Sequence, residues 1–593
     1  MKTPETLAHC WLAMRERPAS ATAVRVKRGD SWKDISWDEY ARDIELAAAG
    51  LLSLGVRPGD RVAIMSETRY EWACADFAVM CVGAVTVPVY ANNTPEDCAY
   101  ILNDSGARVL FIENRASGRA WRKISGDCPS VEKTVCFEKN AAGDDDLAWE
   151  SLLEEGRSRL RADPGAVTRL AAARRADDFA TLIYTSGTTG RPKGVVLRHE
   201  QGVSEVSDAF TYVGVTAQDV SLSFLPYAHV LGRIEMWGHA WIGFTMAFAE
   251  SIEKVRANLQ DIRPTILVAV PRIFEKIHAG IHTQMENQLV KKKLFDWAID
   301  VGQQVGELRM TRQIIPLSLL ARYEAARRLV LDRIKDAFGG RLRFAISGGA
   351  PLAEEISRFF HAAGVLILEG YGMTETTAAI TVNAPFNYRF GSVGRPLPEV
   401  RLRIAADGEV LVKSKKVTRE YYKNPEATAA VLKDGWFHTG DIGHLLPGGD
   451  LRITDRKKDL IKTAGGKYVA PQRIEGLLKM NPLVSHVLVH GDQRKYVVAL
   501  LSPDRAALEK FARDQGIAFR EWTELLKNPK VLDQFRQGVA QANERLASFE
   551  SVKRFAVLPV EFSVEGGELT PSLKVKRKVL DERFRDRIEA LYS

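Results

Sequence analysis

The stretch TLIYTSGTTGRPKG, residues 181–194, follows an apolar run, yet it is too polar for a protein core and too rich in glycine for a helix. Gly187 and Gly190 leave backbone amides accessible, and Lys193 adds an ammonium group. The stretch also carries a cluster of hydroxyl groups, on Thr185, Ser186, Thr188 and Thr189. Amides, hydroxyls and a cation together suit a polyanion, so we expect a loop that binds the phosphates of a nucleotide.

A P-loop of the NTPase type is excluded at this position, because that motif requires G-x-x-x-x-G-K-[ST]. Counted from Gly187, Pro192 stands where the second glycine should be. The residue after Lys193 is Gly194 rather than Ser or Thr. A solvated Ser/Thr/Gly turn is the other interpretation. It is less favoured, because such turns rarely place Tyr184, a hydroxyl cluster, Pro192 and Lys193 in one run.

Length and composition indicate a globular enzyme with more than one domain. The 593 residues exceed what a single core usually supports. With 46% hydrophobic and 27% charged residues, disorder is not expected. The 83 basic and 75 acidic residues leave a net charge of +8. This mild excess suits anionic ligands or a membrane surface, but it is too diluted to indicate a nucleic-acid-binding protein.

Cysteine usage and hydropathy point to a cytoplasmic protein. All six cysteines lie in the first 136 residues without a C-x-x-C pair, which predicts reduced core thiols. No stretch reaches the ~20 apolar residues of a membrane-spanning helix. The amino terminus lacks a convincing signal-cleavage site. We therefore expect a cytoplasmic location, with peripheral membrane contact left open.

The pattern of apolar runs predicts an α/β fold. Between residues 62 and 110, RVAIMS, GAVTVPVY and ARVLFIE alternate with helix-like stretches such as EWACADFAVMCV. Thr94, followed by Pro95 and two acidic residues, predicts a helix start. A second series, VSLSFLP, TILVAVP, RFAISGGAPL and VLILEGYG, predicts strands that run into loops. Ligands of α/β sheets bind at such strand ends.

From about residue 279 to residue 338 the pattern changes to long helices. Ile281, Met285 and Leu289 recur at four-residue spacing ahead of a lysine triplet at 291–293. One interpretation of this helical insertion is a basic amphipathic patch for membranes. The favoured one is a solvated helical pair packed on the main domain, because acidic residues are interspersed.

A domain boundary is predicted within LRITDRKKDLIKTAGGKYVAP, residues 451–471. There a strand-like segment leads into a dense run of charges and then to the flexible pair Gly465 and Gly466. The strands and helices beyond it suffice for a compact module of ordinary domain size. We expect an amino-terminal domain of residues 1–457 and a carboxy-terminal domain of residues 458–593.

Several further segments supply groups suited to a nucleotide. SGGAPL, residues 347–352, offers a turn where the backbone can approach a purine. EGYGMTET, residues 369–376, places Tyr371 beside Thr374 and Glu375. GWFHTGD ends in Asp441, which can accept hydrogen bonds from ribose hydroxyls. Two basic segments, DRKKDLIK and LTPSLKVKRK, add Arg456 and Lys574. Each segment alone has a bland explanation, and only their common order along the chain carries weight.

In this order the segments resemble those of the adenylate-forming superfamily of acyl-CoA synthetases, firefly luciferase and peptide-synthetase adenylation domains. The resemblance covers residues 40 to 578 and is carried by YTSGTTGRPKG, YGMTE, HTGD and DRKKDLIK. LPYAHVLGR, VPRIFEKI, YYKNPEAT, GWFHTGD and the helical insertion are similar to the long-chain fatty acyl-CoA synthetase branch. The resemblance implies a large multi-layer α/β amino-terminal domain and a smaller, mobile α+β carboxy-terminal domain joined at Lys458.

The resemblance also implies which residues bind the nucleotide. The β- and γ-phosphates of ATP would be held by Thr185, Ser186, Gly187, Thr188 and Thr189, with Lys193 nearby. Thr185 and Glu375 would bind Mg²⁺, a hard cation that prefers oxygen ligands. The other contacts would be Gly349, Ala350 and Tyr371 at the adenine, Gly372 and Thr374 next to them, and Asp441 and Arg456 at the ribose.

The implied catalytic residues are Lys574, His229, Glu375 and Lys462. Lys574 would act in acyl-AMP formation. His229 would lie by the acyl carboxylate, although a lone histidine is often structural. Rotation of the small domain would exchange Lys574 for Lys462 and the loop of Gly465 and Gly466 when CoA enters.

The chain departs from the usual family pattern in three places. Leu573 replaces the glycine of P-S-G-K, which reduces the flexibility of the loop before Lys574. Glu420 precedes Tyr421 where relatives often have Gly-Tyr-Tyr, and Ser414 stands where glycine is common. These changes alter turns rather than reactive groups.

The sequence thus predicts a ligase that converts a fatty acid, of long chain by resemblance, into acyl-AMP and then acyl-CoA, with ATP, Mg²⁺ and CoA. A fatty acyl-AMP ligase that loads a separate carrier protein is the alternative within the superfamily. An inactive nucleotide-binding protein or a membrane scaffold is the alternative of another class. Lys574, Glu375 and Arg456 argue against the inactive nucleotide-binding protein, and the scaffold is left open. Nucleic acid is not an expected partner, and a homodimer is left open.

Overall fold

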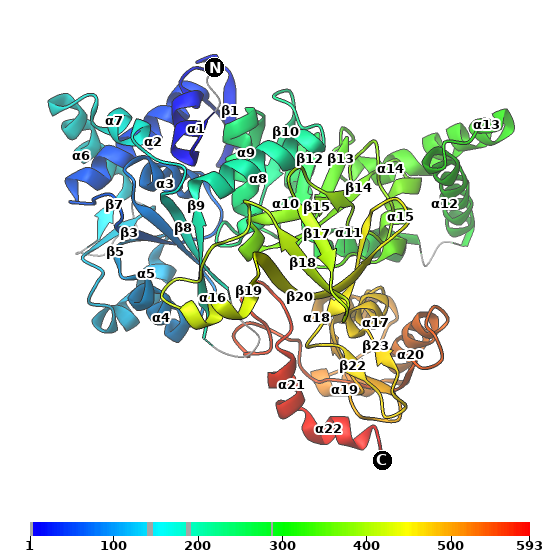
Figure 1. Cartoon of the computed structure of the whole chain (residues 1–593). Helices are drawn as coiled ribbons and strands as arrows, with labels where there is room; N and C mark the ends of the chain where they lie inside the picture. The colour runs from blue at the N-terminus through cyan, green and yellow to red at the C-terminus, as the bar shows by residue number, and fades with distance from the viewer. Residues whose placement is uncertain (1–3, 139–145, 186–190, 286–288) are drawn as a thin grey trace.

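A seven-stranded sheet organises the first part of the chain (Figure 1). The computed structural model describes residues 4–138, 146–185, 191–285 and 289–593. In spatial order the strands are β7 (Leu147–Ala148), β6 (Lys133–Cys136), β5 (Ala107–Ile112), β3 (Arg61–Met65), β4 (Val85–Val89), β8 (Phe179–Thr185) and β9 (Lys193–Arg198). All neighbours are parallel except β8 and β9, which flank the hydroxyl-rich loop.

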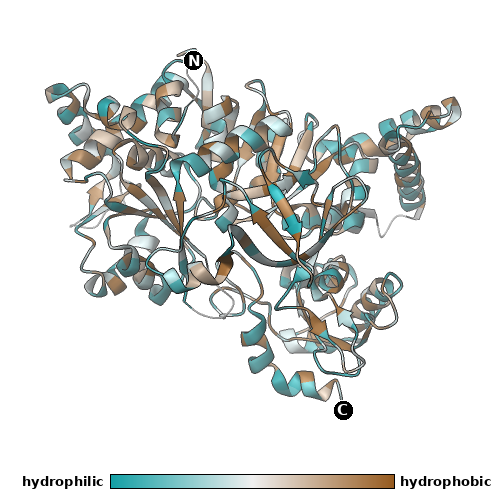
Figure 2. Ribbon diagram, in the orientation of Figure 1, coloured by the Kyte–Doolittle hydropathy of each residue, from teal (hydrophilic) through white to brown (hydrophobic). Residues whose placement is uncertain are grey.

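Local sequence explains the elements of this sheet. Every residue of β4 is buried, as its unbroken apolar run requires of a parallel strand covered on both faces. Helix α3 (Tyr70–Cys81) is likewise buried on all sides. In α4 (Pro95–Ser105) the hydroxyl of Thr94 accepts a hydrogen bond from the Asp97 amide, which confirms the predicted helix start. Several strands are drawn largely in brown, the hydrophobic end of the scale, in Figure 2.

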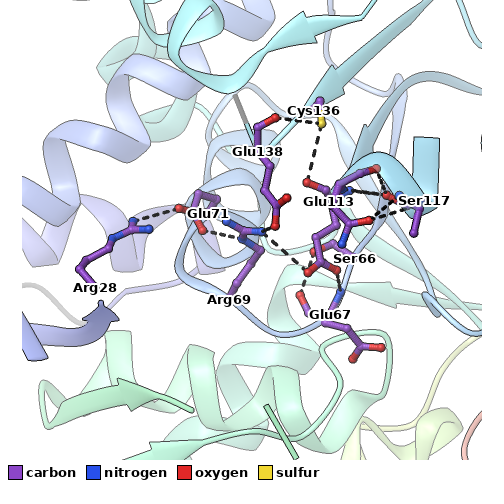
Figure 3. Close-up of polar contacts among 11 residues, drawn as sticks. Arg28, Ser66, Glu67, Arg69, Glu71, Glu113, Ser117, Cys136 and Glu138 are labelled. Atoms are coloured by element: carbon purple, nitrogen blue, oxygen red, sulfur yellow. Dashed lines mark hydrogen bonds and ion pairs between the residues drawn. The ribbon is translucent and has the colours of Figure 1, made fainter. Parts of the chain in front are cut away.

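The topological switch point of this sheet is closed by an ion network (Figure 3). Strands β4 and β5 lie on opposite sides of β3, so a ligand crevice is expected at the ends of β3 and β5. Arg69 fills that position: its Nε lies 2.7 Å from Glu71, and its Nη1 lies 3.8 Å from Glu113 and 3.6 Å from Glu138. The Glu67 amide also donates to Glu113. The nucleotide is therefore expected elsewhere.

Two further sheets also belong to the large domain. One has the order β12 (Ile266–Ala269), β13 (Phe344–Ser347), β14 (Ile367–Met373), β15 (Ala378–Val382) and β16 (Arg395–Pro396). The other has the order β10 (Val220–Ser223), β11 (Thr245–Phe248), β1 (Thr22–Arg28) and β2 (Ser31–Ser36). The four strands predicted from the second apolar series are β10, β12, β13 and β14. Loops follow β10 and β13 as predicted, but β12 is followed after one residue by the helix that begins at Pro271, and β14 runs directly into a 3-10 helix, Thr374–Thr376.

The helical insertion contains α11 (Pro271–Met285), α12 (Leu289–Met310), α13 (Leu317–Ala326), a π-helix (Arg327–Leu331) and α14 (Asp332–Asp336). Helix α12 buries Phe295, Ala298, Val301 and Val305 and packs against α15 (Glu354–Ala362). The prediction of a helical pair packed on the main domain is therefore correct for this inner face.

An antiparallel sheet immediately precedes the carboxy-terminal domain in the chain. It is formed by β17 (Arg401–Ile404), β18 (Glu409–Lys413), β20 (Trp436–Leu445), β19 (Leu432–Lys433) and β21 (Leu451–Arg456). Beyond it, β24 (Val484–His490), β25 (Val497–Pro503) and β26 (Val552–Val557) are covered by α17 (Pro471–Leu478), α18 (Arg505–Asp514) and α20 (Pro529–Asn543). This part has its own core, which includes Ile474, Leu501 and Phe535. The prediction of a large amino-terminal and a smaller carboxy-terminal domain is confirmed.

All six cysteines are buried free thiols, as predicted from their spacing. Within the described ranges, no helix combines the length and the apolar character needed to cross a bilayer.

Candidate active site

A cavity of about 1170 Å³ lies where the strand-end loops of the large domain meet the carboxy-terminal domain. Its walls include the end of β8, the loop after β13, the end of β14 and the segment of Lys458 and Asp459. The carboxy-terminal domain adds residues 570–577. The motifs that are scattered along the sequence therefore converge on one space.

Asp441 is held between a tyrosine and an arginine on one wall. The Tyr371 hydroxyl donates to Asp441 Oδ2 at 2.7 Å, and Arg456 Nε lies 3.2 Å from Asp441 Oδ1. Asp441 and Arg456 are directly paired on the neighbouring strands β20 and β21. Burial raises the pKa of the Asp441 carboxyl, while Arg456 and the tyrosine bond act in the opposite direction. This fixed carboxylate can accept hydrogen bonds from the hydroxyls of a sugar.

Glu375 lies in a short 3-10 helix, Thr374–Thr376, directly after β14, and a tyrosine holds its side chain. The Tyr421 hydroxyl donates to Glu375 Oε1 at 2.8 Å, and Lys193 Nζ lies 5.2 Å from the centre of the Tyr421 ring. Lys193 is in turn paired with Thr185 across β8 and β9. Burial, followed by the charge of Glu375, raises the pKa of Tyr421. Glu375 and Thr185 line the cavity, whereas Lys193, which was also predicted as a site residue, does not.

Two glycines of the site are required by the backbone. Gly349 has φ +82°, a left-handed conformation that disfavours any side chain. A Cβ on Gly372 would lie 1.5 Å from the Ala378 carbonyl oxygen, so no side chain fits there. Ala350 and Thr374 also line the cavity. The backbone can therefore approach a flat ring closely on this wall.

Lys574 enters the cavity from the carboxy-terminal domain. Burial lowers the pKa of its ammonium group, and repulsion from Arg456 lowers it further. The charges of Asp441 and Glu375 act in the opposite direction. Both carboxylates are therefore within electrostatic reach of Lys574. The preceding residue, Leu573, has φ +60°, so the residue that replaces the usual glycine still adopts the left-handed conformation.

His229 precedes α9 (Val230–Ile242) and lines the same cavity. Its Nδ1 accepts a hydrogen bond from the Leu231 amide at 3.2 Å, so the neutral ring carries its proton on Nε2. Burial, followed by the charge of Lys574, lowers the pKa of His229 to about 4. The ring is a neutral hydrogen-bond donor at physiological pH.

Comparison with known proteins shows to which family this chain belongs. Residues 11–422 match the family described as AMP-binding enzyme, which is more than half of the chain. The chain belongs to the AMP-binding enzyme family. Residues 458–593 match a second family description, AMP-binding enzyme C-terminal domain. The resemblance stated from the motifs is confirmed.

Relatives and solved structures agree with that membership. The long-chain-fatty-acid–CoA ligase FadD15 of Mycobacterium tuberculosis is 40% identical over 95% of this chain and 93% of its own. The peroxisomal long chain acyl-CoA synthetase 7 of Arabidopsis thaliana is 30% identical over 96% and 83%. The adenylation domain of a Mycobacterium chelonae carboxylate reductase superposes with a TM-score of 0.75 at 26% identity, over 99% and 91%.

Not every predicted site residue of this AMP-binding enzyme lies in the cavity. Lys462 and Gly466 belong to the hairpin of β22 (Ile461–Lys462) and β23 (Tyr468–Val469), and neither they nor Gly465 line it. Lys462 Nζ lies 5.6 Å from the centre of the Tyr468 ring. Ser186, Gly187, Thr188 and Thr189 lie outside the described residues.

Among the cavity residues that were not predicted from the sequence, three are polar groups with a clear structural role or a shifted pKa. Tyr421, noted only as part of a changed turn, holds Glu375. Glu235 and Glu369 also line the cavity, and burial raises the pKa of each to about 8. Ser223 donates to Glu235 Oε2 at 2.7 Å. No local pattern marks these acids, because their protonation depends on burial by distant segments.

Proposed function

We propose that this AMP-binding enzyme is an ATP-dependent long-chain fatty acid–CoA ligase. One observation carries the proposal: Lys574 of the carboxy-terminal domain lines the same cavity as Asp441 and Glu375 of the large domain. The names of its 30% and 40% identical relatives support the substrate class.

In the first step, a carboxylate oxygen of the fatty acid would attack the α-phosphorus of ATP. A bond forms between this carboxylate oxygen and the α-phosphorus, while the bond between the α-phosphorus and the pyrophosphate oxygen breaks. The products are acyl-AMP and pyrophosphate. Because two anions must meet, the protein has to offset their repulsion. Lys574 would neutralise charge at the reacting phosphate, and His229 Nε2–H would orient the carboxylate.

The nucleotide would be held by the two walls described above. The Asp441 carboxylate would accept hydrogen bonds from the ribose hydroxyls, with Arg456 fixing its position. Tyr371 and the backbone of Gly349 and Ala350 would contact the adenine. The loop from Thr185 to Lys193 would hold the phosphates.

The site also suits Mg²⁺. This ion is commonly bound through one or two carboxylates together with substrate phosphates, and Glu375 has one oxygen beyond its bond with Tyr421. Thr185 would add a hydroxyl. When bound, Mg²⁺ neutralises phosphate charge during phosphoryl transfer.

The second step would require the carboxy-terminal domain, residues 458–593, to rotate about Lys458. Lys574 would then leave the cavity, and Lys462 with Gly465 and Gly466 would approach it. The thiol of CoA would attack the acyl carbonyl, forming a thioester as the bond to AMP breaks. The position of Lys462 outside the cavity agrees with a first-step orientation.

Location and assembly belong to the same proposal. We propose a cytoplasmic enzyme in peripheral contact with a membrane, and we retain the homodimer as a prediction. Fatty acid, ATP and CoA would be its small-molecule substrates.

The test is pyrophosphate release by purified protein with ATP, magnesium and acids graded by chain length, with and without CoA. We expect release that depends on the acid, and thioester formation with CoA. Acyl transfer to a carrier protein but not to CoA would favour the acyl-AMP ligase alternative. Absence of AMP with every acid would contradict the proposal.

A further inference from the structure

Helix α17 of the carboxy-terminal domain begins against a carboxylate of the large domain. Asp455 belongs to β21, and its Oδ2 accepts a hydrogen bond from the Gln472 amide at 3.0 Å. Ala470, the N-cap residue of α17, has only a methyl side chain and cannot accept this bond. Pro471, the first residue of the helix, has no amide hydrogen. The side chain that caps α17 is therefore supplied by a strand of the large domain.

The Asp455 carboxylate is buried and fixed. Its side chain belongs to a residue that is 1% exposed, and its Oδ1 accepts a second hydrogen bond from the Arg456 amide at 2.6 Å. Burial raises the pKa of the Asp455 carboxyl to about 6, and the hydrogen bonds from the amides of Gln472 and Arg456 act in the opposite direction. The group is therefore largely ionised at neutral pH. A carboxylate stabilises the N-terminus of a helix through the exposed amides and the helix dipole.

Glu475, one turn further along α17, holds the segment that carries Lys574. Arg577 Nη2 donates to both carboxylate oxygens of Glu475 at 2.7 Å, and Arg577 follows Lys574 by three residues. Glu475 Oε1 also accepts from the Val489 amide at 2.9 Å. Charge-assisted bonds of this kind are strong and fix orientation. Asp455, Glu475, Arg577 and Lys574 all line the active-site cavity. A continuous path of contacts thus leads from β21 through α17 to Lys574.

The opposite end of α17 also contacts the large domain. Lys479, its C-cap residue, places Nζ 3.7 Å from Glu275 of α11. Arg272, on the same helix α11, lies 3.3 Å from Asp504, the N-cap residue of α18. These two ion pairs are partly exposed, and such pairs contribute little singly. The buried contact of Asp455 is therefore expected to contribute most to the placement of α17.

We propose that Asp455 is a positioning residue for acyl-AMP formation, because it holds α17 in the orientation that places Lys574 in the cavity. The proposed rotation about Lys458 would separate the two partners, since Asp455 precedes Lys458 in the chain and α17 follows it. A contact that is made in only one of two orientations shifts the equilibrium between them by its whole contribution. The inference rests on the proposed function, because it assigns Asp455 to one of the two half-reactions.

The test compares the two half-reactions in Asp455→Ala and Asp455→Asn. Acyl-AMP formation is followed as pyrophosphate release without CoA, and thioester formation is followed after CoA is added to supplied acyl-AMP. Asparagine keeps one acceptor oxygen for the two amides, and alanine keeps none. The matched control is Asn528→Ala. Asn528 Oδ1 accepts from the Lys530 amide at 3.0 Å and so caps α20 within the carboxy-terminal domain.

We expect Asp455→Ala to lower the ratio of the acyl-AMP rate to the thioester rate at least about tenfold, as loss of a hydrogen bond to a charged group predicts. Asp455→Asn should change the ratio less and in the same direction. The control should leave the ratio within about twofold, because its cap joins two residues of one domain. A residue that only stabilised the fold would lower both rates together. Thermal unfolding of the variants checks that the proteins compared are folded.

A second measurement requires no catalysis. Spin labels are attached to cysteines introduced at two exposed positions, Arg401→Cys in the large domain and Lys510→Cys in the carboxy-terminal domain. The six native cysteines are buried, which favours labelling of the introduced ones. We expect one main distance between the labels when Asp455 is intact, and a shifted or broader distribution in Asp455→Ala.

Equal loss of both half-reactions in Asp455→Ala, or an unchanged ratio of their rates, would overturn the proposal. So would an unchanged distribution of label distances, whatever the rates. A wild-type protein that forms no acyl-AMP would instead contradict the proposed function. In that case the label distances would still decide whether Asp455 holds α17 in place.

Discussion

Replacing Asp441 with asparagine should weaken nucleotide binding while the fold is retained. Asp441 Oδ2 accepts from Tyr371 at 2.7 Å and Oδ1 lies 3.2 Å from Arg456. An amide turns one of these oxygens into an NH₂ donor, which then faces either the tyrosine hydroxyl or the guanidinium. The ribose hydroxyls also lose a charged acceptor. Hydrogen bonds to charged groups contribute about 1.5–3 kcal/mol each, so the KM for ATP should rise about 10- to 150-fold.

The assay is pyrophosphate release across ATP concentrations at saturating fatty acid, combined with calorimetric binding of AMP. AMP binding does not require chemistry, so it separates affinity from turnover. Glu399→Gln is the control, because Glu399 pairs with Lys415 at 2.7 Å on the surface, where ion pairs contribute little. If the folded Asp441→Asn protein keeps the KM for ATP and the Kd for AMP within about threefold of the wild type, Asp441 does not hold the ribose.

Three further outcomes follow from the structure. Lys574→Ala should slow acyl-AMP formation ~10²- to 10³-fold but spare thioester formation from supplied acyl-AMP, and equal loss in the two half-reactions would contradict the assigned role. Lys458→Pro should lower thioester formation at least about tenfold more than adenylation, because it restricts the proposed hinge; an unchanged ratio of the two rates counts against a hinge there. Burial lowers the pKa of His199 to about 3, so the unfolded chain takes up a proton there below about pH 6.5 and the folded chain does not. Denaturant titrations should therefore show the wild type losing stability relative to His199→Leu as the pH falls from about 6.5 to 3, and a constant difference would show that His199 is not protected.

Much of this enzyme is determined locally. The strands β3, β4, β5, β10, β12, β13 and β14 and the start of α4 agree with apolar runs and capping chemistry, because period and turn residues act within a few positions. The motif residues Asp441, Arg456, Tyr371, Glu375 and Lys574 all line the cavity. For these residues, the order of the motifs along the chain carried the information.

Other features depend on contacts between residues far apart in the chain. The bond between Tyr421 and Glu375 and the raised pKa of Glu235 and Glu369 arise from packing of separate elements, which no local pattern encodes. The closure of the β3–β5 crevice by Arg69 has the same origin.

The sequence by itself thus determined the fold class, the motifs and the family. Only the tertiary structure decided which carboxylates share a cavity with Lys574 and that Lys462 lies outside it. It also decided that Ile314 and Leu317 face solvent although they are apolar. The physical reason is that periodicity specifies which residues form an element, whereas burial, charge and exposure depend on what the other elements place beside them.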